Sequence, residues 1–149
     1  MENESKRKKS EEALAEIYRN TNLAMQSIED ILPEVDHEGM TKELHAQHEG
    51  YSKICAKVAK IAKDKGIALK EPGMFKKAMM WSSIKMSTLS DDSPSHIAEM
   101  MVQGTVMGIT ALKRTAGEVL FDENEDVGAL LSDMIKTEEE FEKKWKEYL

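Results

Sequence analysis

Apolar residues recur at three- and four-residue steps along most of the chain, which is the spacing of one face of an α-helix. Turn and capping residues separate the segments that carry this pattern. The pattern predicts α-helices over residues 10–32, 40–65, 72–89, 93–119 and 125–148. The most apolar stretch, Ile97–Leu112, has Glu99 as its one charged residue. We therefore expect the 93–119 helix to be the most buried element.

Local residue choices mark the ends of several of these helices. Pro33 disfavours the helical conformation in the residue before it, so the first helix ends there. Gly66 follows two lysines and can adopt a left-handed backbone, which is typical of a helix C-terminus. Ser93 as N-cap and Pro94 at the first helical position predict the start of the next helix. A short connection is expected over 121–124.

Loop lengths predict how the helices are arranged. Short loops join 10–32 to 40–65 and 93–119 to 125–148, so each pair is expected to be antiparallel. A long connection containing the 72–89 helix joins the two pairs. This order predicts an all-α fold, a ferritin-like up-down-down-up four-helix bundle with a crossover that holds an extra helix. Whether 72–89 is a crossover or the fifth member of a bundle stays open.

Composition is consistent with one helical domain of 149 residues, with 33% charged and 5% aromatic residues. Residues 1–9 carry a run of lysine and arginine and are expected to form a flexible basic arm before a single domain over 10–149. The net charge of −7 argues against general nucleic-acid binding, which needs a basic surface.

Features of secreted and membrane proteins are missing from the sequence. Cys55 is the one cysteine, so no intramolecular disulfide can form. The N-terminal residues have no apolar core of signal-peptide length, and no apolar run has the length of a membrane span. We therefore expect a cytoplasmic protein that does not enter a membrane.

One stretch resembles a known group. Residues Trp81–Gly108, WSSIKMSTLSDDSPSHIAEMMVQGTVMG, together with Ser27–Asp36, SIEDILPEVD, are similar to an uncharacterised group of bacterial proteins in the ferritin-like superfamily. The resemblance covers residues 10–149. It implies a ferritin-like four-helix bundle, and it implies no established activity.

The residues needed for a ferritin-like di-iron site are incomplete. Such a site takes a glutamate from each of two helices and a Glu-x-x-His pair from each of the other two. The last predicted helix has no histidine. The 40–65 helix has His45 and His48 at this spacing in place of Glu-x-x-His, and His96 and Glu99 stand in reverse order. A standard di-iron site is therefore not expected.

Counting along the helices places four polar residues at one depth, roughly 15 Å from one end of the bundle at the α-helical rise. These residues are His48, Gln103, Glu138 and Thr21, and they predict a buried polar layer. One interpretation is a hydrogen-bonded network that fixes helix register. The other is a metal site that uses His48, Glu138 and Glu99, which lies about one turn above the layer.

The remaining candidates favour packing roles. Cys55 lies on an apolar stripe and is expected to be an inert buried thiol. The eleven methionines fit core or interface packing, since methionine fills irregular gaps. His37 and His45 are expected to be exposed.

Three functional hypotheses follow. The first is a non-enzymatic ferritin-like bundle that acts in a protein assembly as a homo-oligomer, without a cofactor and with any partner protein unidentified. The second is a metal-binding or redox protein with a degenerate site in the bundle interior. The third is a protein that binds a small apolar ligand between helices, beside Gly104 and Gly108.

Overall fold

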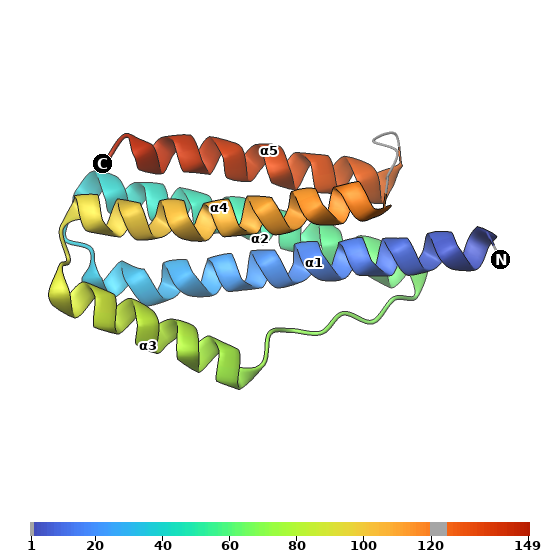
Figure 1. Ribbon diagram of the computed structural model, residues 1–149, viewed down its shortest axis with the longest axis horizontal. Coiled ribbons are helices and arrows are strands. Elements are labelled where there is room, and N and C mark those ends of the chain that lie inside the picture. Colours follow the sequence, from blue (N-terminus) through green and yellow to red (C-terminus); the bar gives the residue numbers. More distant parts are fainter. Residues whose placement is uncertain (1, 120–124) are drawn as a thin grey trace.

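The computed structural model describes residues 2–119 and 125–149, and this part of the chain is all-helical (Figure 1). The predicted connection over 121–124 lies outside the described residues. The elements are α1 (Glu2–Ile31), a short 3-10 helix (Leu32–Glu34), α2 (Glu38–Lys65), α3 (Met74–Ser90), α4 (Pro94–Val119) and α5 (Asp126–Lys146). The all-α class predicted from the periodicity is confirmed.

Four helices pack side by side as two pairs. α1 and α2 form one antiparallel pair and α4 and α5 form the other, while α4 also packs along α1 (Figure 1). α2 and α4 run in the same direction, and the chain returns between them through α3. The interior between these helices is filled by fully buried side chains such as Leu14, Leu44, Leu112, Met134 and Trp145.

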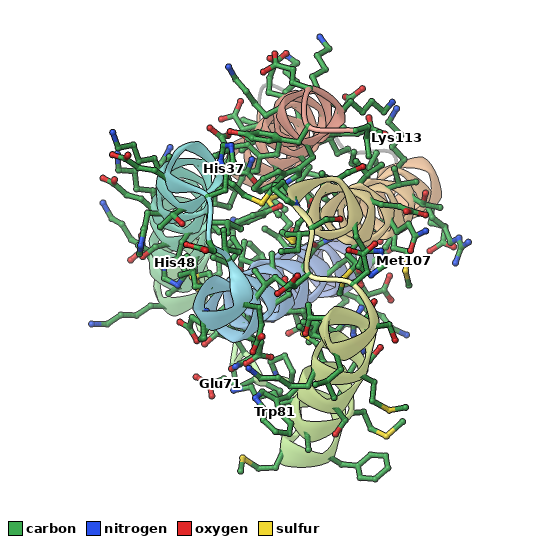
Figure 2. The ribbon with its side chains drawn as sticks, turned by 90° about the vertical axis from the view of Figure 1, so that its left-hand side faces the viewer. His37, His48, Glu71, Trp81, Met107 and Lys113 are labelled. Atoms are coloured by element: carbon green, nitrogen blue, oxygen red, sulfur yellow. The ribbon has the colours of Figure 1, made fainter. Side chains whose placement is uncertain are left out.

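α3 lies outside this group and packs principally against α1 (Figures 1 and 2). Only Ile84 and Thr88 of this helix are buried. The sequence predicts that α3 is well covered, because it is apolar on more than one side, and this prediction is wrong for the isolated chain. An apolar pattern shows which faces can be buried, and here just one face of α3 has a partner.

The helix ends follow the local signals. Gly66 terminates α2 with a left-handed backbone of φ 68°, which only glycine adopts without strain. The amide of His96 donates to the Ser93 hydroxyl at 3.3 Å, so Ser93 caps the start of α4 before Pro94. Both predicted boundaries are confirmed.

α1 begins at Glu2, so the expected flexible arm over 1–9 continues the helix from residue 2. Arg7 donates to the carbonyl oxygens of Lys65 at 3.0 Å and Gly66 at 3.2 Å. These carbonyls close α2 and have no partner within that helix, so a cation is favourable there. Lys6 also forms an ion pair with Glu125 at 2.8 Å. The basic run thus ties α1 to the ends of α2 and α5.

The buried face of α4 differs from the predicted one by one residue. The sequence predicts a seam through Ile97, Met101, Gly104, Gly108, Ala111 and Thr115. Ile97 is buried as predicted, but the other buried side chains of α4 are Ala98, Thr105, Ile109 and Leu112. A shift of one residue rotates the buried face by about 100°. α4 is consequently not the most buried helix, and Met107 is 74% exposed (Figure 2).

Candidate functional site

A groove of about 630 Å³ opens between α1, α3 and α4, and we call it the α1–α3–α4 groove. It exists because α3 stands away from α4 and because α4 presents two glycines, Gly104 and Gly108, on this side. The surface of the groove is mainly apolar, and its lining includes Leu23, Met80, Ile84, Met100, Met101 and Met107. The volume is within the range of small-molecule sites, roughly 300–1,000 Å³.

The inner end of the groove is formed by two residues from the far helices, Tyr51 of α2 and Glu138 of α5. Their exposed fractions are 3% and 1%. The Tyr51 hydroxyl donates to Glu138 Oε2 at 3.3 Å. The other carboxyl oxygen, Oε1, is buried and has no hydrogen-bond partner among the described residues. A buried polar atom without a partner is rare in proteins and costs free energy.

Gly108 makes room for this carboxyl. A Cβ atom at position 108 would lie 2.7 Å from Glu138 Oε2 and 2.9 Å from Asn20 Oδ1. The Asn20 amide also donates to the Gly108 carbonyl oxygen at 3.1 Å. Side chains of α1 and α5 therefore meet over the backbone of α4 at Gly108, a position that has no side chain.

Burial controls the protonation of this carboxyl. Desolvation raises the pKa of Glu138 from 4.5 to about 8, and the hydrogen bond from Tyr51 opposes the rise without reversing it. Burial and the adjacent Glu138 carboxylate raise the pKa of Tyr51 well above 10. Near pH 7, Glu138 is consequently neutral. A neutral carboxyl carries one O–H donor, so Glu138 can donate one hydrogen bond as well as accept.

The other charged groups on the groove are an ion pair and a lysine. Arg19 pairs with Glu16 within α1, and Lys76 comes from α3. The residues that α4 contributes to the lining are all uncharged. The groove thus has a neutral buried carboxyl at its inner end and both positive and negative side chains elsewhere in its lining.

The four residues of the predicted polar layer do not stay together. Thr21 and Glu138 are buried, with exposed fractions of 0% and 1%. His48 is half-buried at the surface, where its Nε2 lies 3.0 Å from Glu29 Oε1 (Figure 2). Gln103 is exposed and belongs to the groove lining. The prediction that His48 and Gln103 belong to the buried polar layer is therefore wrong.

The proposed metal ligands are separated as well. Glu99 is exposed, His48 pairs with Glu29, and Glu138 is in the interior. Within the described ranges, no group of three or more His, Cys, Asp or Glu side chains is arranged to hold a metal ion. His48, Glu99 and Glu138 consequently do not form one site in this conformation.

A register ambiguity explains the displacement of His48. The buried residues of α2 include Leu44, Gln47, Tyr51 and Ile54, whereas the predicted stripe used His48 and Cys55 in place of Gln47 and Ile54. A helical stripe allows steps of three or four, so both sets satisfy the pattern. Gln47 donates to Glu43 Oε1 at 2.9 Å within its own helix.

Two residues of the inner end were not singled out by sequence reasoning. Asn20 lies beside the predicted Thr21, and Tyr51 is one turn below His48. The signals that could have found them are Gly108, which allows close approach on α4, and Glu138, a carboxylate at an apolar position. Together these mark where polar side chains of neighbouring helices can meet.

The exposure of the remaining candidate residues can be compared with what the sequence predicts. Cys55 is half-buried, with its Sγ 3.9 Å from the Asn22 amide nitrogen, so it is less buried than expected. His37 and His45 are exposed. Among the methionines, Met40 and Met134 have an exposed fraction of 0%, while others lie at the surface. No helix of the described chain has the length and hydropathy of a bilayer crossing.

Comparisons with protein-family models, with curated proteins and with solved structures found no match to this chain.

Gly108→Ala is expected to destabilise the protein and Gly104→Ala to stabilise it. The Cβ at 108 collides with Glu138 and Asn20, which costs about 1–3 kcal/mol. The Cβ at 104 meets no atom within 4 Å, so the higher helix propensity of alanine contributes up to about 1 kcal/mol. Urea unfolding followed by circular dichroism measures both. Equal effects of the two substitutions would contradict the close approach at Gly108.

The pH dependence of stability should report the buried carboxyl. The folded-state pKa of about 8 lies above 4.5, so the folded protein binds more protons between these values. The contribution of Glu138 is complete below pH 4.5 and is lost as pH rises to about 8, with a slope approaching roughly 1.4 kcal/mol per pH unit. Glu138→Gln does not titrate. The unfolding free energy of wild type minus that of the variant should therefore fall across this range, and a constant difference would exclude a raised pKa.

Proposed function

We propose that the protein is a non-enzymatic, ferritin-like helical bundle that acts in a protein assembly by self-association through the outer face of α3. The exposed apolar surface of α3 carries the proposal. Two antiparallel helix pairs joined by a long crossover support the ferritin-like assignment. A cytoplasmic location, expected on sequence grounds, is part of the same proposal.

The outer face of α3 is a second apolar stripe. It consists of Phe75, Met79, Ser82, Met86 and Leu89, which we call the outer seam. The seam residues are spaced by alternating steps of four and three, and all lie within about 40° of the direction opposite the buried Ile84. The exposed fractions of Phe75 and Leu89 are 80% and 86%. Alternating steps of this kind are typical of helices that pair along their length.

The outer seam is self-complementary about Ser82. When two copies of α3 pair in antiparallel orientation, Phe75 of one faces Leu89 of the other and Met79 faces Met86. Ser82 then faces Ser82 at a two-fold axis, where a small residue permits close helix approach. A two-fold interface of this kind uses the same patch on both copies and closes on itself. The occupant of this face is therefore a second copy of the chain.

Charges at the ends of α3 favour the same orientation. Lys76 is exposed at the N-terminal end, and Asp91 and Asp92 are exposed just after the C-terminal end. Antiparallel pairing places Lys76 of one copy beside the aspartates of the other. Parallel pairing would instead place equal charges together, which is unfavourable.

The composition of the groove supports a role other than catalysis. Among the residues that line it, none is histidine or cysteine, and the titratable groups at its inner end are one neutral carboxyl and one phenol. Acid–base and nucleophilic catalysis generally need a nucleophile and a base within hydrogen-bond reach.

The double substitution Met79→Lys with Met86→Lys is expected to convert a dimer to a monomer. It places two lysines of each copy in the centre of the interface, and the dissociation constant should rise by about 100-fold or more because the charges are desolvated and repel. Sedimentation velocity measures the change. Met107→Lys, an equally exposed methionine on α4, is the matched control and should remain dimeric. A monomeric wild-type chain at about 100 μM would reject the proposal.

Disulfide trapping in a Cys55→Ser background tests the orientation. Phe75→Cys mixed with Leu89→Cys should form a covalent heterodimer under mild oxidation, because these positions face each other only in the antiparallel pair. Phe75→Cys alone should not cross-link. Efficient cross-linking of Phe75→Cys to itself would indicate parallel pairing.

A further inference from the structure

We propose that the α1–α3–α4 groove is a binding site for a small, uncharged organic molecule with an apolar body and one hydrogen-bond acceptor, such as an alcohol, a ketone or a carboxamide. The acceptor pairs with the carboxyl of Glu138 at the inner end of the groove. The site is separate from the outer seam, because groove and seam lie on opposite faces of α3. It therefore does not depend on self-association.

The first observation is an unpartnered polar group at the end of an apolar cavity. Glu138 is 1% exposed, lines the groove, and leaves Oε1 without a hydrogen-bond partner among the described residues. Tyr51 pairs with the other carboxyl oxygen, so the carboxyl has hydrogen-bonding capacity left for a ligand. A polar ligand group that pairs with the carboxyl removes the cost of its unsatisfied buried oxygen.

The second observation is the room that glycine provides. A Cβ at Gly104 would meet no atom within 4 Å, so the groove passes directly over the backbone of α4 there. Four methionines, Met80, Met100, Met101 and Met107, line the cavity beside it. Methionine side chains adapt to the shape of an apolar partner, so they suit the apolar body of a ligand.

Charge decides between classes of ligand. The groups that share the groove with Glu138 are Tyr51 from α2, the Glu16–Arg19 ion pair from α1 and Lys76 from α3, and α4 contributes no charge. Glu138 is neutral near pH 7 because burial raises its pKa to about 8. A cation would have to displace that proton and pass Lys76 at the mouth. An anion would lose its hydration in a mainly apolar groove, where a single neutral carboxyl does not compensate the charge, so an uncharged head fits best.

Binding can be observed directly on the methionines of the groove. Protein labelled with ¹³C at the methionine methyl groups is titrated with 1-hexanol, hexanamide and hexylamine. Hexanol and hexanamide should shift the signals of Met80, Met100 and Met101 and leave those of the buried core residues Met40 and Met134 in place. Hexylamine, a cation near pH 7, should bind at least tenfold more weakly. Absence of shifts at the groove methionines, or tighter binding of hexylamine than of hexanol, would overturn the proposal.

Variants separate the head contact from the cavity. Glu138→Leu removes the donor and should weaken hexanol binding about tenfold, whereas Glu138→Gln keeps a donor and should remain within about threefold of wild type. Gly104→Leu fills the groove without touching Glu138 and should abolish binding of all three probes. The unchanged signals of Met40 and Met134 show that each variant is folded. Equal affinity of wild type and Glu138→Leu would exclude the carboxyl as the binding group.

The affinity for 2-hexanone, a ketone that accepts but cannot donate a hydrogen bond, should also depend on pH. It should be constant below pH 8 and fall about tenfold above it, because ionised Glu138 no longer donates, and Glu138→Gln should show no such fall. An affinity that stays constant or rises above pH 8 would exclude the protonated carboxyl as the donor and reject the proposal. The measurements are repeated on the Met79→Lys and Met86→Lys variant. If that variant is monomeric and still binds the probes, the ligand site is independent of self-association.

Discussion

The close approach of Glu138 and Asn20 to the backbone of Gly108 is the constraint on which the structure of this bundle depends. It brings α1, α4 and α5 to one point, and Tyr51 of α2 joins them through its hydrogen bond to the carboxyl. Each of the four paired helices therefore contributes to the contacts around one buried acidic side chain. A side chain at position 108 would separate them, and loss of the carboxyl would leave the Tyr51 hydroxyl without its acceptor.

α3 leaves an open surface on each of its two sides. Its inner face contacts α1 through Ile84 but does not close over α4, and the groove that results extends to Glu138. Its outer face carries the seam from Phe75 to Leu89, which no described element covers. One crossover helix therefore accounts for both proposals, a ligand site beneath it and a second copy of the chain above it.

Helix positions were predictable because their signals are local: Gly66 terminates α2 and Ser93 begins α4. The side that each helix buries was less predictable, because a stripe of steps of three or four accepts either Gln47 or His48. α4 is apolar on several sides, so periodicity could not select its buried face and Gln103 was placed inside. Glu138 was identified correctly because a carboxylate at an apolar position of an otherwise regular stripe indicates burial.

Burial keeps the carboxyl of Glu138 neutral near pH 7. Difference infrared spectroscopy between wild type and Glu138→Gln tests it most directly, since a protonated carboxyl has a carbonyl stretch distinct from that of a carboxylate. One protonated-carboxyl band is expected at about pH 7 in the wild type, absent from the variant and lost as pH rises through about 8. A wild-type spectrum with every carboxyl ionised at about pH 7 would contradict it.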